Sequence, residues 1–363
     1  GDHRDLHRVD RRQRQMCIRD SVNGYGSIGR RIVSFLKDDP EITVVGIGKY
    51  SPDDKVTEAL SKGLEVYVPE NKLENFKNYD ISGTIDSALN KSDLIIDASP
   101  GGNGYKNKKN IYESKNISVI YQGGESIIGD QAVSDLLFNS RANYDEALGK
   151  SHVMQGSCNV TGMGRILEPL RDAFGDKIIR FDVTLVRRWA DIEQTEKTVS
   201  DTIEMTEKPH HGDDVKLYFG KDAPLYVRAL KVPTRQMHLH IMDIRFKEIA
   251  PKPSEIHSIF ENEFGVATLW TAKGTKDVRD FAQNMGFNFT DTNMIHIHAN
   301  MTVSIGDTVQ MMYSDDQTGI VIPENHMLMQ AMLFGKSYDD AFSHTESIFN
   351  MNEKKQKLQE HFS

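Results

Sequence analysis

Three glycines near the start of the chain constrain its fold more than any other feature. Gly24, Gly26 and Gly29 form a G-x-G-x-x-G pattern, and apolar residues then recur at helical spacing until Pro40. A buried-strand pattern follows directly at residues 42–47. This order predicts a βαβ unit whose glycines let the backbone approach a pyrophosphate at the helix N-terminus. A glycine-rich turn between an unrelated strand and helix is the alternative.

The segments on either side of this unit depart from the usual pattern. Residues 1–21 are rich in arginine and aspartate and show no period, so we expect a non-native or disordered leader where a buried strand should precede Gly24. After the second strand the chain has Lys49, where NAD-specific sites place an acidic residue that binds the ribose. A cation suits a 2′-phosphate and favours NADP, or use of both NADP and NAD; a solvated lysine is the alternative.

Strands and helices continue to alternate up to residue 157. Further buried strands are predicted for residues 64–68, 94–98 and 117–121. A second glycine-rich loop occupies residues 100–104, and the last of these strands leads to Gly123 and Gly124. Because open α/β sheets bind ligands at the carboxyl ends of their strands, both glycines are candidates for a cofactor loop, with an ordinary turn as the alternative.

Beyond residue 157 the pattern becomes that of an α+β domain with a largely antiparallel sheet. Strands are predicted for residues 178–186, 237–244, 294–303, 308–313 and 319–322, and helices for residues 254–264 and 276–285. We therefore expect an α/β protein of two domains. The first is a Rossmann-like dinucleotide-binding domain at residues 22–157, completed by helices at about 324–363, and the second is a catalytic domain at residues 158–323.

Composition excludes several classes of function. The 363 residues are enough for two domains, and a net charge of −9 argues against binding of nucleic acid. No apolar run approaches the ~18 residues of a membrane span. The two cysteines, Cys17 and Cys158, are far apart and offer no disulfide framework, which fits a reducing cytoplasm.

Cys158 is the main candidate for a nucleophile. It stands between Ser157 and Asn159, directly before a run at helical spacing. At a helix N-terminus the backbone N–H groups and the helix dipole favour the thiolate, and with the Asn159 amide they could hold an oxyanion. An inert buried cysteine is the alternative, although apolar packing does not require polar neighbours around a thiol.

Clustered histidines supply a possible base for this thiol. His238 and His240 alternate along a predicted strand, so both imidazoles lie on one face of the sheet. His210 and His211 are adjacent in a predicted loop. Each pair is a candidate for catalysis or for anion binding, with a surface location as the alternative.

Two further pairs indicate an anionic ligand or, alternatively, a metal. Arg187 and Arg188 end a predicted strand and offer planar donors to a phosphate, which favours a phosphorylated substrate. His296 and His298 form a second H-x-H pair of the kind that binds zinc in hydrolases. The zinc hypothesis has no third ligand with its own spacing and leaves the glycine loop unexplained, so we expect no metal.

Taken in order, these motifs resemble those of the archaeal-type (type II) phosphorylating glyceraldehyde-3-phosphate dehydrogenases. The matching segments are residues 23–29, 122–125, 143–144, 147–150, 157–159, 186–188, 210–211, 237–240 and 321–325. The resemblance extends from about residue 22 to about residue 335. The chain differs from the family at Trp189 and at Gly162-Met163-Gly164 in the helix after Cys158.

The resemblance implies oxidation of D-glyceraldehyde 3-phosphate to 1,3-bisphosphoglycerate with NAD(P)+ and inorganic phosphate, in glycolysis or gluconeogenesis. It implies that Cys158 is the nucleophile, that His238 is the general base, and that the protein is a cytoplasmic homotetramer. Ser157, Asn159, His210 and His211 match positions that contact substrate. Positions that contact the cofactor are matched by Ser27, Ile28, Gly123 or Gly124, Arg187 or Arg188, and Gln317, with Lys49 at a position suited to the 2′-phosphate.

Two other functions stay open at this point. Another cysteine-dependent semialdehyde dehydrogenase, such as aspartate-semialdehyde dehydrogenase, also joins a dinucleotide fold to a cysteine nucleophile. A non-catalytic dinucleotide-binding protein would keep the first domain and lose turnover.

Overall fold

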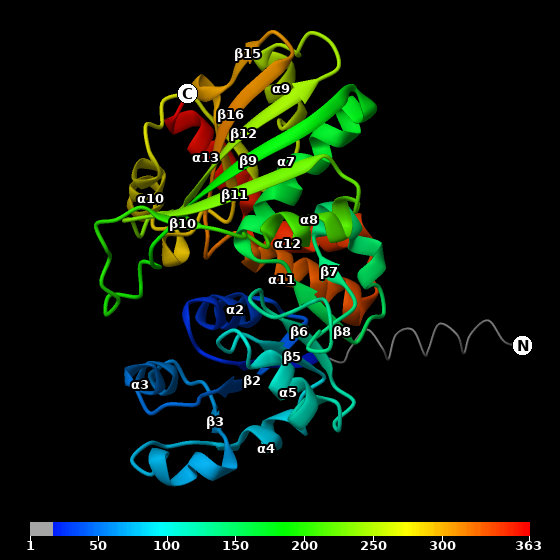
Figure 1. The fold of residues 1–363 in the computed structure, drawn as a ribbon. Helices are drawn as coiled ribbons and strands as arrows, with labels where there is room; N and C mark the ends of the chain where they lie inside the picture. Colours follow the sequence, from blue (N-terminus) through cyan, green and yellow to red (C-terminus); the bar gives the residue numbers. More distant parts are fainter. Residues whose placement is uncertain (1–16) are drawn as a thin grey trace, which may run out of the picture. The chain divides into compact units, whose positions relative to one another are not determined.

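The computed structural model describes residues 17–363, which form two compact units (Figure 1). The first unit runs to Val133 and also contains Lys150–Val153. The second unit comprises Ser134–Gly149 and Met154–Ser363. The unit that contains the expected catalytic domain thus begins earlier than residue 158, and it includes the C-terminal helices that we expected to complete the other domain.

A parallel sheet forms the centre of the first unit. Its strand order is β4-β3-β2-β1-β5-β6-β8, and the pairings from β4 to β6 are parallel. The strands are β1 Ile18–Asn23, β2 Ile42–Gly48, β3 Val66–Val68, β4 Gly83–Thr84, β5 Leu94–Asp97, β6 Ser118–Tyr121 and β8 His152–Gln155. The helices are α2 Ser27–Asp38, α3 Asp54–Ser61, η1 Glu70–Phe76, α4 Ile85–Leu89, α5 Gly104–Asn107 and η2 Lys108–Tyr112.

The strand order reverses between β1 and β5, as it does in doubly wound sheets. The loops that follow these two strands therefore flank the position where such sheets bind their ligands. This topology confirms the expected Rossmann-like fold. The last two residues of β8 belong to the second unit, where they pair in parallel with β7, Leu137–Phe138.

The first strand begins earlier than its sequence indicates. β1 starts at Ile18, inside the segment that we expected to lie outside the fold, and pairs with both β2 and β5. Backbone hydrogen bonds to two neighbouring strands impose this conformation, whereas polar side chains hide the strand pattern. Asp20 is fully buried, and its carboxylate oxygens have no hydrogen-bond partner within residues 17–363. Residues 1–16 of the expected leader lie outside the described residues.

A largely antiparallel sheet forms the second unit, as expected. Its order is β10-β11-β9-β12-β16-β14-β13, with β15 paired to β16. β11 pairs with β9 and β13 with β14 in parallel, and the other pairings are antiparallel. The strands are β9 Ile178–Arg188, β10 Glu204–Thr206, β11 Leu225–Val232, β12 His238–Phe246, β13 Val266–Leu269, β14 Ile295–His298, β15 Val303–Ile305 and β16 Thr308–Asp315.

Helix α7, Cys158–Phe174, lies against β9 and β16, and most of its residues are buried. The other helices of this unit are α6 Ser140–Asn143, η3 Tyr144–Ala147, η4 Gly175–Lys177, α8 His211–Phe219, α9 Pro253–Ile259, α10 Thr275–Asn284, η5 Asn288–Thr290, η6 Ala299–Met301, α11 Val321–Met329, η7 Gln330–Phe334, α12 Tyr338–Phe349 and α13 Met351–His361. None of the helices within residues 17–363 combines the length and the apolar character that a bilayer crossing requires.

A buried ion pair explains why the C-terminal helices belong to the second unit. Arg165 on α7 lies 2.8 Å from the carboxylate of Glu324 on α11, and both side chains are almost fully buried. Glu324 also accepts hydrogen bonds of 2.8 Å from the backbone N–H and the hydroxyl of Ser140. At the end of the chain, the N–H of Trp270 donates to the carbonyl of Phe362 at 2.7 Å. These contacts tie both α11 and the C-terminus to this unit.

Residues 319–322 were predicted as a strand, and this prediction was wrong. They lead into helix α11, Val321–Met329, in which every residue is buried. A helix that is buried on all sides shows no polar face, so its short apolar run cannot be distinguished from a buried strand by periodicity.

Candidate active site

The glycine loop predicted to hold a pyrophosphate connects β1 to α2 in the first unit. Gly24 has a φ of 113°, and a Cβ on it would lie 2.6 Å from the carbonyl oxygen of Ala98. A Cβ on Gly29 would lie 2.0 Å from the carbonyl oxygen of Gly24. The fold itself therefore requires these two glycines. Gly26 differs, because a Cβ there would meet no atom within 4 Å.

The N-terminus of α2 is suited to bind an anion. Gly26 is its N-cap, no side chain caps it, and its first turn, which begins with Ser27 and Ile28, contains no acidic residue. The first N–H groups of such a helix have no partner in the helix and carry the positive end of its dipole. The second glycine-rich loop differs, since the Glu125 carboxylate accepts backbone N–H groups at the start of α5 at 2.7 and 2.9 Å.

Gly123 and Gly124 lie in the loop after β6, as predicted. Gly124 has a φ of 108°, which favours glycine. A Cβ on Gly101, in the loop after β5, would lie 3.0 Å from the Gly124 carbonyl oxygen. The loops that follow two neighbouring strands are thus in close contact at the carboxyl edge of the sheet.

Lys49 lies directly after β2, at the position predicted for a contact to a ribose phosphate. Its Nζ is 2.7 Å from Oδ1 and 2.8 Å from Oδ2 of Asp53. Asp53 is also the N-cap of α3 and accepts a hydrogen bond from the N–H of Lys55. The positive charge at this position is therefore shared with a carboxylate of the same loop.

Cys158 is the first residue of α7, which confirms its predicted place at a helix N-terminus. The residue keeps some exposure to solvent. Burial nevertheless raises the pKa of its thiol to about 12, while the charge of Arg188 acts in the opposite direction. The thiolate therefore depends on the donors and cations that surround the sulfur.

His238 brings a ring nitrogen to this sulfur. Its Nε2 lies 3.3 Å from the Sγ of Cys158, and the backbone N–H of Arg188 donates to its Nδ1 at 3.1 Å. Because Nδ1 accepts this bond, the neutral ring carries its proton on Nε2, facing the sulfur. Burial first, and then the charge of Arg188, lowers the pKa of His238 well below its usual value. The ring is thus a neutral donor to the sulfur.

Asn159 and His240 form a second contact to the sulfur. The Nε2 of His240 lies 2.9 Å from the Oδ1 of Asn159, and the amide nitrogen of Asn159 lies 3.8 Å from the Sγ of Cys158. Since an amide oxygen only accepts, the Nε2–H of His240 donates to it. Burial lowers the pKa of His240 to about 3, so this ring is also neutral.

The predicted arginine pair ends β9. Arg188 binds the carboxylate of Asp191 through Nε at 2.8 Å and through Nη2 at 2.7 Å. The side chain of Gln317 donates to the same carboxylate at 3.5 Å. Arg187 instead donates from Nη2 to the hydroxyl of Thr206 at 2.8 Å. Arg188 and Gln317 therefore share a carboxylate, whereas Arg187 does not contact it.

His210 is the N-cap of helix α8 and His211 is its first residue, although we predicted a loop for both. Their rings stack with centroids 4.3 Å apart, and Nδ1 of His210 lies 2.7 Å from the Asp214 carboxylate, which raises the pKa of His210. Burial lowers the pKa of His211 to about 3. His211 also lowers the pKa of His238, so His211 lies within electrostatic reach of that ring.

Four of the predicted site residues each have a buried polar atom without a hydrogen-bond partner. A buried polar group in a protein normally has such a partner, so each of these atoms is a candidate contact to a polar ligand. Within residues 17–363 the buried atoms without a partner include Ser157 Oγ, Arg187 Nε, His211 Nδ1 and Gln317 Oε1.

The second H-x-H pair is not arranged as a metal site. Nε2 of His296 lies 2.9 Å from the hydroxyl of Thr292, and Nε2 of His298 lies 3.1 Å from the hydroxyl of Ser314. The Ser314 hydroxyl is also 3.3 Å from Nδ1 of His296. These contacts account for the two imidazoles by hydrogen bonds to side-chain hydroxyls.

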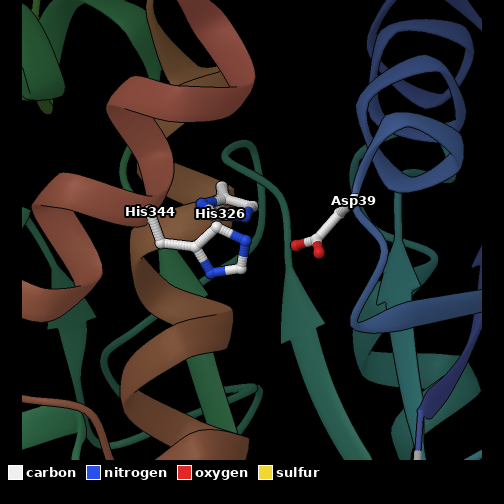
Figure 2. A group of neighbouring side chains, drawn as sticks. All are labelled: Asp39, His326 and His344. Carbon is white, nitrogen blue, oxygen red and sulfur yellow. The ribbon is translucent and has the colours of Figure 1, made fainter.

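His326 and His344 form another histidine pair, on α11 and α12 (Figure 2). Their rings meet edge to face with centroids 5.0 Å apart. Nδ1 of His326 lies 2.7 Å from the Thr345 hydroxyl, and its Nε2 lies 3.3 Å from the Gln330 amide. Because both nitrogens of His326 have partners inside the second unit, the pair joins the two helices. Asp39, also drawn in Figure 2, belongs to the first unit.

The departures from the family pattern have visible causes. A Cβ on Gly164 would lie 2.4 Å from the side-chain nitrogen of Asn139, and a Cβ on Gly162 would lie 3.1 Å from a carboxylate oxygen of Asp315. Trp189 packs under the ammonium of Lys231, which lies 4.0 Å from its ring centroid. The glycines thus make room for polar side chains against α7.

Sequence reasoning missed two carboxylates of this site. Asp191 pairs with Arg188 from a loop without a period, and nothing in its local sequence indicates this role. Asp315 is fully buried at the end of β16, 3.4 Å from Nε2 of His240. An adjacent pair of aspartates at the end of an apolar strand was a signal that we did not use.

Several curated proteins are similar to this chain over most of their length. No family model matches the chain. Glyceraldehyde-3-phosphate dehydrogenase of Methanothermus fervidus is 33% identical over 323 residues, which cover 86% of this chain and 93% of that protein. The enzyme of the same name from Halobacterium salinarum is 34% identical, covering 74% and 80%, and that of Sulfolobus acidocaldarius is 30% identical, covering 92% and 97%. The chain belongs to the archaeal-type glyceraldehyde-3-phosphate dehydrogenase family.

Proposed function

We propose that this chain catalyses the phosphorylating oxidation of D-glyceraldehyde 3-phosphate to 1,3-bisphosphoglycerate, with NAD(P)+ as oxidant and inorganic phosphate as second substrate. The observation that carries the proposal is the 3.3 Å contact between the Cys158 sulfur and a ring nitrogen of His238, at the N-terminus of a buried helix. Family membership names the substrate, and this contact supplies the nucleophile that its oxidation requires.

The first unit contains residues that fit a dinucleotide. Gly26 leaves open space at the uncapped N-terminus of α2, where a pyrophosphate finds backbone N–H groups. The cofactor supplies the hydride acceptor when bound. We propose that Ser27, Ile28 and Gly124 of the first unit contact it, while cofactor contacts of Arg188 and Gln317 stay predictions from the family resemblance. Lys49 is proposed to favour a 2′-phosphate, in competition with Asp53.

Cys158 begins the reaction by attack of its thiolate on the aldehyde carbon, and the former carbonyl oxygen takes a proton from water to give a thiohemiacetal. The Nε2–H of His238 and the Asn159 amide face the sulfur and stabilise its negative charge. A bound cofactor would accept the hydride from this carbon, and with loss of the hydroxyl proton the thiohemiacetal would become a thioester. A phosphate oxygen then attacks the acyl carbon, and the thiolate departs as 1,3-bisphosphoglycerate is released.

His238 is proposed as the base that takes the hydroxyl proton. To accept this proton at Nε2, the ring must carry its own proton on Nδ1, which the N–H donated by Arg188 opposes. The resting geometry therefore favours stabilisation of the thiolate, and the base role requires the ring to release Arg188. We also propose that His210, His211 and Arg187 bind the phosphate groups, because Arg187 lies within electrostatic reach of the thiol and of both histidines, and because Arg187 Nε and His211 Nδ1 have no partner within residues 17–363.

Steady-state assays with each aldehyde test this function. We expect reduction of NAD+ or NADP+ with glyceraldehyde 3-phosphate, dependent on inorganic phosphate, and none with aspartate semialdehyde. Turnover with aspartate semialdehyde alone would assign the chain to the other class of dehydrogenase. Cofactor binding without turnover of either aldehyde would identify a non-catalytic binding protein. We further propose a cytoplasmic homotetramer, for which light scattering at micromolar concentration should give four times the chain mass.

A further inference from the structure

Asp315 places a carboxyl group beside the residues that contact the thiol. It is the last residue of β16, it is fully buried, and its register partner on β12 is His238. One of its oxygens lies 3.4 Å from Nε2 of His240. Neither oxygen has a hydrogen-bond partner within residues 17–363. A buried carboxyl group without a hydrogen-bond partner lowers the stability of the folded protein, so stability does not explain why aspartate occupies this position.

The nitrogen that Asp315 approaches also controls the orientation of Asn159. Nε2 of His240 donates to the Asn159 oxygen at 2.9 Å, and this turns the Asn159 amide nitrogen toward the Cys158 sulfur, 3.8 Å away. The aromatic ring of Tyr313 packs edge to face on His240, with centroids 4.8 Å apart. His240 is therefore held between Asp315, Asn159 and Tyr313.

Helix α7 is adapted to this carboxyl group. Gly162 lies one turn after Cys158, on the same face of the helix, and a Cβ on it would lie 3.1 Å from Oδ2 of Asp315. A glycine inside a helix lowers the stability of the folded protein relative to alanine. Gly162 and the unpartnered carboxyl group of Asp315 each lower the stability of the folded protein, and the two residues lie next to each other.

We propose that Asp315 is a positioning residue that fixes His240, and through His240 the Asn159 amide that faces the Cys158 sulfur. One oxygen of the carboxyl group lies 3.4 Å from Nε2 of His240, and this contact restricts the position of the ring. Without it, His240 and Asn159 lose a defined orientation, and the sulfur loses one of its donors. The inference rests on the proposed role of Cys158 as the nucleophile.

The charge state of Asp315 fits this role. Burial raises the pKa of its carboxyl group to about 8, so the neutral acid prevails near pH 7. A negative charge on Asp315 would raise the pKa of Cys158, and the neutral acid avoids this effect. Asparagine therefore resembles the active form, with the same shape and an oxygen that accepts. The charged and titratable groups around Asp315 are His238, His240, Cys158, Arg188, Tyr313 and Asp316.

Alkylation of Cys158 by iodoacetamide tests the proposal without any substrate. The Asp315→Leu variant removes the carboxyl group beside His240, and we expect its alkylation rate at pH 7 to fall roughly tenfold, the effect of losing the charge-assisted hydrogen bond from the Asn159 amide to the thiolate. In Asp315→Asn the rate should stay within about twofold of the wild type, on the same basis. The matched control is Met311→Leu, a volume-conserving change on the same buried face of β16. Its rate should equal that of the wild type.

A structural role predicts a different pattern. Removal of an unpartnered carboxyl group should raise the melting temperature of Asp315→Leu, and an unchanged alkylation rate in such a stabilised variant would overturn the proposal. If Asp315→Leu fails to fold, the proposal is tested by the pH dependence of Cys158 alkylation in Asp315→Asn. Its Cys158 should alkylate with a lower apparent pKa than the wild type, and superimposable profiles would refute the link. Because alkylation needs no aldehyde, these outcomes are independent of the proposed substrate.

Discussion

The sulfur of Cys158 lies 3.3 Å from Nε2 of His238, although the two residues come from the start of a helix and the start of a strand. The backbone N–H of Arg188 donates to the other ring nitrogen at 3.1 Å. One strand end thus fixes which nitrogen of His238 carries the proton, and the sulfur receives a donor. Burial opposes the thiolate at this position, so its reactivity depends on these donors.

The first prediction concerns His238. Replacement by asparagine removes both the donor to the sulfur and the proposed base, and kcat with glyceraldehyde 3-phosphate should fall roughly 10²- to 10⁴-fold. Cofactor affinity, measured by fluorescence titration, should be unchanged. His361→Asn at the exposed end of α13 is the control. A kcat within a few-fold of the wild type would exclude His238 from the chemistry.

The second prediction separates two glycines of the cofactor loop. Gly26→Ala places a methyl group where no atom lies within 4 Å, so the melting temperature should stay the same while cofactor affinity drops roughly tenfold through loss of close approach. Gly29→Ala forces a Cβ to 2.0 Å from the carbonyl oxygen of Gly24 and should destabilise the first unit itself. Calorimetry and cofactor titration of both variants provide the measurement. Equal effects on stability would contradict the distinction.

The third prediction concerns the ion pair of Lys49 with Asp53. Asp53→Asn keeps the N-cap of α3 but removes the charge that competes for Lys49, so the KM for NADP+ should fall a few-fold. Lys49→Ala should raise that KM and leave the KM for NAD+ nearly unchanged. If neither variant alters the ratio of the two constants, Lys49 does not contact a 2′-phosphate.

The fourth prediction concerns the buried carboxyl group of Asp20. Burial raises its pKa well above the usual value, so the unfolded chain ionises at lower pH than the folded protein. The wild type therefore loses stability as the pH rises above about 4, the unfolded pKa. Asp20→Val, which suits a buried strand, should be more stable by roughly 2–4 kcal/mol at pH 7. In urea unfolding the difference should shrink towards pH 3, and a difference that does not vary with pH would contradict this explanation.

Local patterns were sufficient to predict the first unit but not where its first strand begins. The glycines, the helix after them and the strand at residues 42–47 follow from spacing, because each is set by near neighbours. β1 was missed because Asp20 and Ser21 occupy a strand whose conformation comes from pairing with β2 and β5. The start of α11 was missed because burial on all sides removes the periodicity.

The active site was predictable only in part, for a related reason. Cys158 was identified from its scarcity and the helix after it. The strand spacing made His238 and His240 candidates for its base, and the resemblance selected His238. No local sequence pattern predicts that these two side chains are in contact, because α7 and β12 come together only when the sheet and its helix pack in the folded unit. Asp315 acts through the register of β16 with β12, which is a property of the assembled sheet.

A cysteine thioester is tested by comparing the wild type with Cys158→Ser in the presence of glyceraldehyde 3-phosphate, inorganic phosphate and each cofactor in turn. We expect phosphate-dependent formation of NADH or NADPH by the wild type. In Cys158→Ser, turnover should fall by roughly 10³-fold or more, since a serine hydroxyl is a far weaker nucleophile without an adjacent base. Cofactor binding should persist. Turnover by Cys158→Ser within about tenfold of the wild type would contradict the central claim that the reaction passes through a cysteine thioester.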